Sequence, residues 1–167
     1  MTLPPDLPRD RDTAGRPRNA RPRDALGRPL EHGAAGEPTL PDEQALAPGA
    51  ALVLAQRLID DGRPFQAHEV LEASWRAAPP GERELWRGLA QIAVGLTHAQ
   101  RGNARGAVAL LRRGSQGVSG CSGTARHGID AAGLARSAAA VALRIEREGL
   151  TGLTPADLML RLQEAAG

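Results

Sequence analysis

One short segment of the sequence carries most of the side chains that could do chemistry. Residues 64–76 read PFQAHEVLEASWR, and His68 and Glu72 lie four residues apart within this run. At 3.6 residues per helical turn, residues spaced by four lie on the same face of a helix. An imidazole and a carboxylate on one face can transfer a proton, ligate a divalent metal ion or form a hydrogen-bonded pair.

The same helical face gathers further polar and aromatic side chains. On a helical wheel an arc of roughly 120° contains Phe65, His68, Glu69, Glu72, Trp75 and Arg76. A surface helix usually groups its aromatic residues with its aliphatic ones, whereas here the aliphatic residues lie opposite. We therefore expect both faces of this helix to be covered, with the histidine and the two carboxylates at least partly removed from water.

A second segment predicts what faces this helix. Four residues recur at spacings of three, four and three and so share one stripe of a helix: Gly88, Gln91, Gly95 and His98. Glycine costs about 1 kcal/mol relative to alanine inside a helix. Two glycines on one stripe therefore predict the close approach of a neighbouring helix, which we expect to be the helix at 64–77.

The two helices together define a candidate binding cluster, whose members are His68, Glu69, Glu72, Trp75, Gln91 and His98. One interpretation of this cluster is a metal-assisted hydrolase, with His68, Glu72 and His98 as ligands and Glu69 or Gln91 as a fourth. Helical bundles do build metal sites from Glu and His on facing helices. The His-Glu-x-x-His signature is absent, however, because position 72 is a glutamate. We therefore expect no cofactor and keep a divalent metal ion as the alternative.

Two other interpretations of the cluster stay open. The leading one is a binding module that takes up a small molecule, a small acid, a peptide or a protein partner, including a second copy of the chain, between its helices. The other is a purely structural network, in which buried carboxylates paired with arginine fix the register of the helices. The number of donor atoms that converge on one point distinguishes the metal site from the paired network.

The elements that must position these residues are helices. The apolar periodicity and the boundary residues predict helices at about 50–61, 64–77, 82–101, 104–113, 130–148 and 154–165, with a Gly/Ser-rich loop at 114–128. Pro64 suits a first helical position, and Asp130 and Thr154 suit N-caps. No segment alternates as a strand does. We expect an all-α fold, a compact antiparallel bundle of about five to six helices joined by short connections.

The chain divides by composition into two parts. Residues 1–48 hold nine of the thirteen prolines, and their seven arginines are mixed with eight acidic residues. Such a segment buries too little apolar surface to offset its ordering entropy, so we expect residues 1–48 to be a disordered tail and 49–167 to be the helical domain.

Charge and composition exclude several classes of protein. All 21 basic residues are arginine, but 19 acidic residues leave a net charge of +2, which argues against a nucleic-acid partner. No segment has the roughly 20 apolar residues of a membrane helix, and the N-terminus lacks the apolar core of a secretory signal. We therefore expect a cytoplasmic protein without membrane contact. The single Cys121 excludes an intrachain disulfide framework.

The motifs above resemble one bacterial family, the domain of unknown function 309. The resemblance covers about residues 50–131 and rests on five matching stretches: Phe65 to Trp75, Gly88 to Gln91, His98, Gly102 to Ala107, and Asp130. It implies a compact all-α domain found as a small stand-alone protein, and it implies no established activity or substrate. Pro64 stands where the family usually has an aromatic or bulky residue.

Overall fold

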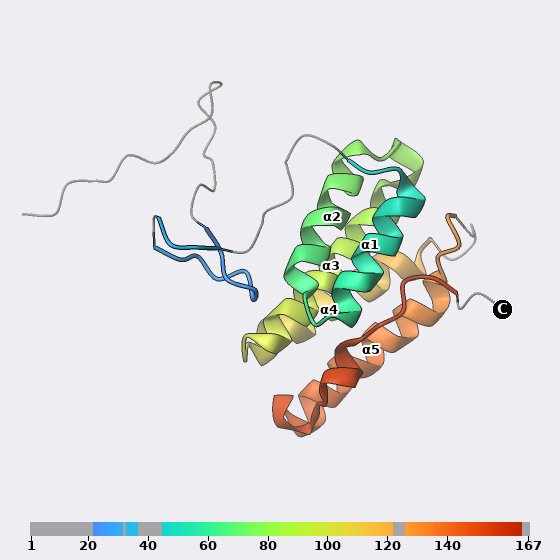
Figure 1. Cartoon of the computed structure of the whole chain (residues 1–167). Helices are drawn as coiled ribbons and strands as arrows, with labels where there is room; N and C mark the ends of the chain where they lie inside the picture. The colour runs from blue at the N-terminus through green and yellow to red at the C-terminus, as the bar shows by residue number, and fades with distance from the viewer. Residues whose placement is uncertain (1–21, 32, 37–44, 122–125, 165–167) are drawn as a thin grey trace, which may run out of the picture.

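The computed structural model describes residues 22–31, 33–36, 45–121 and 126–164 of the chain (Figure 1). Its elements are α1 (Pro48–Asp60), α2 (Pro64–Ala77), η1 (Pro80–Glu82), α3 (Arg83–Gln100), α4 (Ala104–Ser119), α5 (Ala131–Glu148), η2 (Leu150–Gly152) and η3 (Pro155–Leu158). Across these residues the extended pairing amounts to isolated β-bridges. The predicted all-α bundle is therefore confirmed, with five α-helices.

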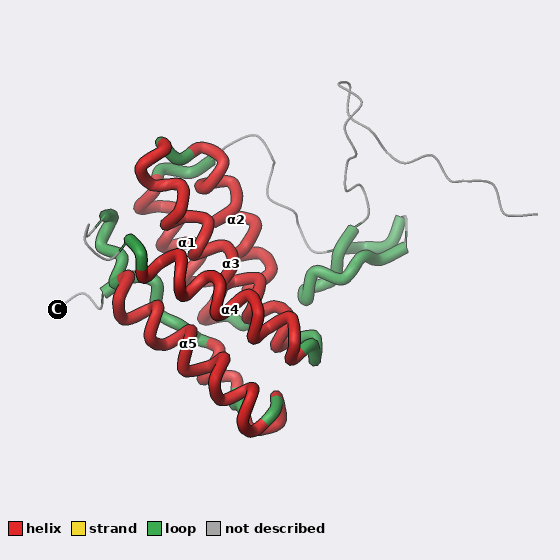
Figure 2. Tube along the Cα trace, turned by 180° about the vertical axis from the view of Figure 1, so that it is seen from behind, coloured by secondary structure: helices red, strands yellow, loops and turns green. Residues whose placement is uncertain are grey.

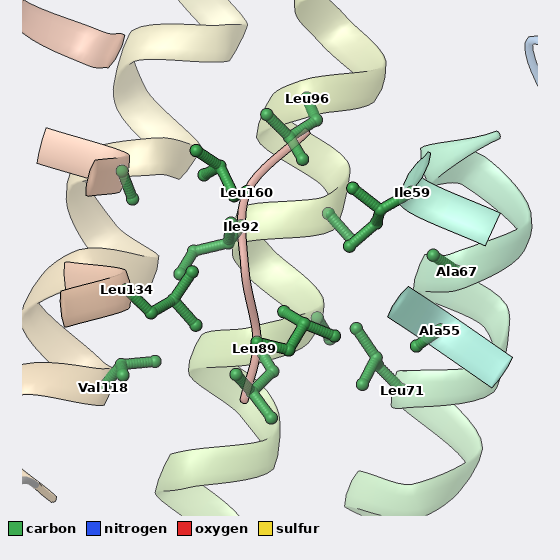
Figure 3. Packing of buried hydrophobic residues seen from close by; sticks show 14 of the residues in the cluster. Ala55, Ile59, Ala67, Leu71, Leu89, Ile92, Leu96, Val118, Leu134 and Leu160 are labelled. Atoms are coloured by element: carbon green, nitrogen blue, oxygen red, sulfur yellow. The ribbon is translucent and has the colours of Figure 1, made fainter. Parts of the chain in front are cut away.

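Each α-helix packs against the next one along the chain, so that α3 lies between α2 and α4 (Figure 2). The core is built mainly from leucine, isoleucine and alanine, as Figure 3 shows around α3. Trp86 is the one aromatic side chain in this core and is 1% exposed. The other two aromatic residues, Phe65 and Trp75, are only partly buried.

The helix boundaries follow the local signals of the sequence. Gly62 ends the turn after α1 with φ +72°, and Pro64 takes the first position of α2. Asn103 caps α4 by accepting a hydrogen bond from the Gly106 backbone N–H at 2.9 Å. Asp130 caps α5 in the same way, through the Gly133 N–H at 2.8 Å. These side chains satisfy backbone donors that a helix leaves unpaired at its start.

The glycine stripe of α3 does mark a close helix approach, but the partner is α4. A Cβ atom on Gly88 would lie 2.7 Å from Cγ2 of Val118, and one on Gly95 would lie 2.8 Å from Cγ of Leu111. The expectation that the two glycines face α2 was wrong, because spacing identifies the face of a helix and does not identify the helix that covers it.

Helix α4 is longer than the sequence pattern predicted. It continues through the expected Gly/Ser-rich loop as far as Ser119. Gly114 lies inside it, where a Cβ atom would come within 2.8 Å of the Gly88 carbonyl oxygen. Gly114, which looked like a loop residue, is therefore an interhelical contact, and the two backbones approach closely at Gly88 and Gly114.

The expected last helix at 154–165 does not form in the described residues of that segment. Its start is correct, because the Thr154 N–H donates to the Asp157 carboxylate at 2.7 Å, but the helix is a single 3-10 turn, η3. The chain then runs alongside α1, where Gln56 donates to the Leu160 carbonyl at 3.1 Å and accepts from the Leu162 N–H at 2.8 Å. Leu160 and Leu162 are buried there. The bonds to Gln56 take the place of the backbone hydrogen bonds that a helix would have formed.

Part of the expected tail contacts the bundle. Residues 22–30 form a tight turn, in which Asp24 Oδ1 accepts the N–H groups of Leu26 and Arg28, and Arg101 Nε donates to the Leu26 carbonyl at 2.7 Å. The division of the chain into a disordered tail at 1–48 and a helical domain at 49–167 stays a prediction from the sequence. The prediction for residues 1–21 and 37–44 falls outside the described residues.

None of the helices in the described ranges is both long and apolar enough to span a membrane. The cytoplasmic location stays a prediction from the sequence.

Candidate functional site

A groove of about 270 Å³ runs along the exposed side of α2 and α3. It is lined by His68, Glu72 and Trp75 of α2, by Arg87, Ala90, Gln91 and Val94 of α3, and by Leu110 of α4. Four members of the predicted cluster thus lie together: His68, Glu72, Trp75 and Gln91. We refer to this groove as the Trp75 groove.

Glu72 is the centre of the polar group at the groove. Its Oε2 lies 3.1 Å from Nε2 of His68, and its Oε1 accepts a hydrogen bond of 2.6 Å from Nη2 of Arg76. All three residues belong to one face of α2, as the four-residue spacing predicted. The Glu72 side chain is 29% exposed, so this group is partly solvated and differs from the fully buried network that was one expectation.

His68 is largely shielded from water, with 22% of its side chain exposed. Burial lowers the pKa of His68 below its ordinary value, and the positive charges of Arg76, Arg101 and Arg23 act in the same direction. The Glu72 carboxylate opposes this shift. His68 is therefore held mainly as the neutral imidazole at neutral pH, because desolvation outweighs the attraction of the carboxylate.

The remaining lining combines apolar side chains with two polar ones. Trp75 forms one wall and is partly exposed, whereas Val94 and Leu110 supply aliphatic surface. Arg87 is 49% exposed, and its closest carboxylate, that of Glu84, is 3.6 Å away. A groove with apolar walls and a few polar groups is typical of sites that bind small organic molecules or side chains.

Two members of the predicted cluster are not part of the groove lining. The Nδ1 atom of His98 lies 3.0 Å from Nδ2 of Asn103, at the turn from α3 to α4. Burial, with a smaller effect of Arg101, lowers the His98 pKa. Glu69 also lies outside the lining. His98 lies against the start of α4, beside Gly106, whereas Gln91 of the same stripe lines the groove.

The predicted metal ligands therefore do not converge. His68 and Glu72 are adjacent, but His98 is engaged at the far end of α3. Across the described ranges no group of three or more His, Cys, Asp or Glu side chains is arranged to hold a metal ion. Two donors from one helix leave a metal ion without the further protein ligands that it takes in known bundle sites.

The sequence reasoning missed a second polar cluster, around Glu82. Its carboxylate accepts hydrogen bonds from Trp86 Nε1 at 3.2 Å and Arg126 Nη1 at 3.0 Å, and it lies 3.0 Å from His127 Nε2. These bonds, those of His127 and Trp86 foremost, lower the Glu82 pKa to about 2. The cluster ties the start of α3 to a turn 44 residues away, and no local spacing signals such a contact.

A second cavity, also of about 270 Å³, lies between the bundle and the segment after α5. Its lining is mainly apolar and includes Ile59, Pro64, Leu153, Leu158 and Met159, together with Gln100. No predicted site residue lines it, so it is the alternative location for an apolar ligand.

Comparisons with known proteins place the Trp75 groove inside a recognised sequence unit. Residues 52–110 match the family model described as domain of unknown function (DUF309). A curated relative, "Uncharacterized protein YpuF" of Bacillus subtilis (strain 168), is 44% identical over 48 residues, which is 28% of this chain and 28% of that protein. The comparison with solved structures gave no match. Every residue of the groove lining falls within 52–110.

Proposed function

Residues 52–110 match the DUF309 family model, and we propose that this segment is a binding module whose Trp75 groove takes up an apolar group bearing a carboxylate. The observation that carries the proposal is the lining itself: each groove residue, from His68 to Leu110, falls within the family segment. The second cavity is lined in part by residues beyond position 110.

Trp75 supports the apolar part of this proposal. Trp86 is 1% exposed and fills the core, whereas Trp75 leaves part of its ring at the groove surface. Covering exposed apolar surface contributes roughly 25 cal/mol per Å². An aromatic or aliphatic group lying between Trp75 and Val94 would remove both side chains from water.

Arg87 and Gln91 support the carboxylate. Arg87 is half exposed and 3.6 Å from Glu84, longer than a direct charge-assisted hydrogen bond. A guanidinium group binds a carboxylate through two parallel hydrogen bonds, and the Gln91 amide, which also lines the groove, supplies a further donor. Glu72 adds little repulsion because Arg76 neutralises its charge at 2.6 Å.

The experiment titrates the protein with benzoate and hexanoate and follows the two tryptophan indole N–H signals by NMR. The Trp75 signal is assigned with Trp75→Phe. We expect the Trp75 signal to shift in a saturable manner while the Trp86 signal stays in place, and benzamide, which lacks the charge, to bind more weakly. Arg87→Gln should weaken binding of both acids, and Arg136→Gln, an exposed arginine of α5, should not.

An absence of any saturable shift, or equal binding of benzoate and benzamide, would contradict the proposed ligand class. The metal-assisted hydrolase alternative is tested in the same samples. It requires zinc or manganese to raise the thermal midpoint of the wild type more than that of His68→Ala, because a ligand of the folded state stabilises that state. We expect equal midpoints, since no third ligand lies beside His68 and Glu72 within the described ranges.

A further inference from the structure

The turn at residues 22–30 and the end of α3 bring two arginines, Arg23 and Arg101, over one aromatic ring (the turn is blue in Figure 1). The Cζ atoms of Arg23 and Arg101 lie 5.5 and 5.6 Å from the centroid of the Phe65 ring. Gly27, with φ +72°, rests directly on that ring, and a Cβ atom there would overlap it. The turn is therefore seated closely on α2, and Arg28 follows within the same turn.

Hydrogen bonds to the turn orient two of the three guanidinium groups. Arg23 Nη1 donates to the Gly27 carbonyl at 2.7 Å, and Arg101 Nε donates to the Leu26 carbonyl at 2.7 Å. The Nη2 atom of Arg101 is buried and has no hydrogen-bond partner among the described residues. A buried guanidinium donor without an acceptor is costly, so an acceptor supplied by a ligand would stabilise this arrangement.

The charge of this region is unbalanced. No carboxylate in the described part of the chain forms a salt bridge with Arg23, Arg28 or Arg101. Asp24 is the acidic residue of the turn, and its Oδ1 accepts two backbone N–H groups. Burial and the positive charges of Arg23 and Arg28 lower the pKa of Arg101. The negative charge of Asp24 has the opposite effect and raises it. Three positive charges and one negative charge leave a local charge of +2.

We propose that Arg23, Arg28 and Arg101 form a binding site for a phosphate group, either free or carried as a monoester on a small molecule. A phosphate group carries about −1.5 to −2 charges at neutral pH, which matches the local charge of +2. Its oxygens are the acceptors that the planar guanidinium group pairs with in bidentate fashion. The site goes beyond the proposed function, because none of the three arginines lines the Trp75 groove.

The site combines the turn at residues 22–30 with the C-terminal end of α3. A ligand that binds both would hold the turn against the bundle. Two arginines come from the turn and one from the residue that follows α3. The same turn covers Phe65, whose ring lies 5.8 Å from that of His68 in the Trp75 groove. A bound phosphate would therefore stabilise the turn where it covers the N-terminal part of α2, which contains Phe65 and His68.

The experiment uses the full chain in a chloride buffer and titrates inorganic phosphate and glycerol phosphate by isothermal calorimetry. We expect saturable binding of at least one of them. Arg101→Gln and Arg23→Gln should each weaken it by about tenfold or more, since each removes a charge-assisted pair. Arg147→Gln, an exposed arginine of α5, is the charge-matched control and should leave the affinity within about twofold. Arg101→Lys, which keeps the charge and loses the bidentate geometry, should lie between the wild type and Arg101→Gln.

Tighter binding of glycerol phosphate would identify a monoester as the ligand, and equal or tighter binding of inorganic phosphate would identify the phosphate group alone; both results support the site. Lack of saturation by either probe overturns the proposal. An equal loss of affinity in Arg147→Gln and Arg101→Gln also overturns it, because the attraction would then belong to the overall charge. Circular dichroism of each variant establishes that the helices are intact.

Discussion

The imidazole Nε2 of His68 and the carboxylate Oε2 of Glu72 lie 3.1 Å apart on consecutive turns of α2. The pair borders the Trp75 groove, and Glu72 also binds the exposed Arg76 at 2.6 Å. The pair is therefore open to solvent on one side and shielded on the other. This arrangement allows the structural and the binding interpretations of Glu72 to be separated by stability measurements.

Replacing Glu72 with alanine should lower the free energy of unfolding by about 1 kcal/mol or less. Arg76 is 62% exposed and Glu72 is 29% exposed, so water can replace most of the lost contacts. Urea unfolding at pH 7, with the m-values compared, measures the change. A loss of about 3–5 kcal/mol would indicate a buried pair in which the remaining partner is left uncompensated.

Acidification from pH 7 toward pH 5 should destabilise the protein through His68. Burial lowers the pKa of His68 in the folded state below its value of 6.5 in the unfolded chain. The unfolded state therefore binds more protons between these two pKa values, so the full stability is present above pH 6.5 and is lost as the pH falls below it. His68→Gln should reduce this slope, measured as unfolding free energy against pH. His98, whose pKa burial also lowers, should leave a residual slope. An unchanged slope in His68→Gln would contradict the assigned burial of this imidazole.

A separate acid transition should arise from Glu82. Hydrogen bonds from His127, Trp86 and Arg126 lower its pKa from 4.5 to about 2. The stabilisation by Glu82 is complete above pH 4.5 and is lost as the pH falls toward 2. Glu82→Gln should remove this part of the stability curve and lower the midpoint at pH 7. The measurement compares the thermal midpoints of Glu82→Gln and the wild type between pH 2 and pH 7. Parallel curves for the variant and the wild type would mean that these bonds do not persist in solution.

Two glycine substitutions test the contact between α3 and α4. Gly95→Ala should destabilise by about 1–3 kcal/mol, because the new Cβ would lie 2.8 Å from Leu111 Cγ and 3.0 Å from its backbone nitrogen. Gly117→Ala is the matched control within α4, since its Cβ would lie 3.6 Å from the Cα of Gly88. The control should be neutral or stabilise by up to about 1 kcal/mol through helix propensity. Equal effects in urea unfolding would contradict the close packing at Gly95.

Local signals in the sequence predicted the starts of α2, α5 and η3 correctly, whereas the ends of α4 and of the segment after Thr154 were wrong. Pro64 begins α2, Asp130 caps α5 and the Thr154–Asp157 pair begins η3, because each signal acts within one helical turn. The grouping of His68, Glu72 and Trp75 followed in the same way from their spacing on one helix.

Contacts between distant segments could not be predicted in this way. The stripe of Gly88 and His98 identified a helix face, but its partner depended on the packing of the whole bundle. The bonds of Glu82 to His127 and of Gln56 to Leu160 join residues 45 and 104 positions apart. The arginines around Phe65 likewise come from segments that the composition assigned to different parts of the chain.

The most direct test of the binding function is an intermolecular NOE measurement with hexanoate at saturating concentration. If the Trp75 groove is the binding site, the methylene protons of hexanoate should give cross-peaks to the indole of Trp75 and to the methyl groups of Val94 and Leu110, which line it. Cross-peaks to Leu158 and Met159 in the second cavity instead, or none to either set, would contradict the account.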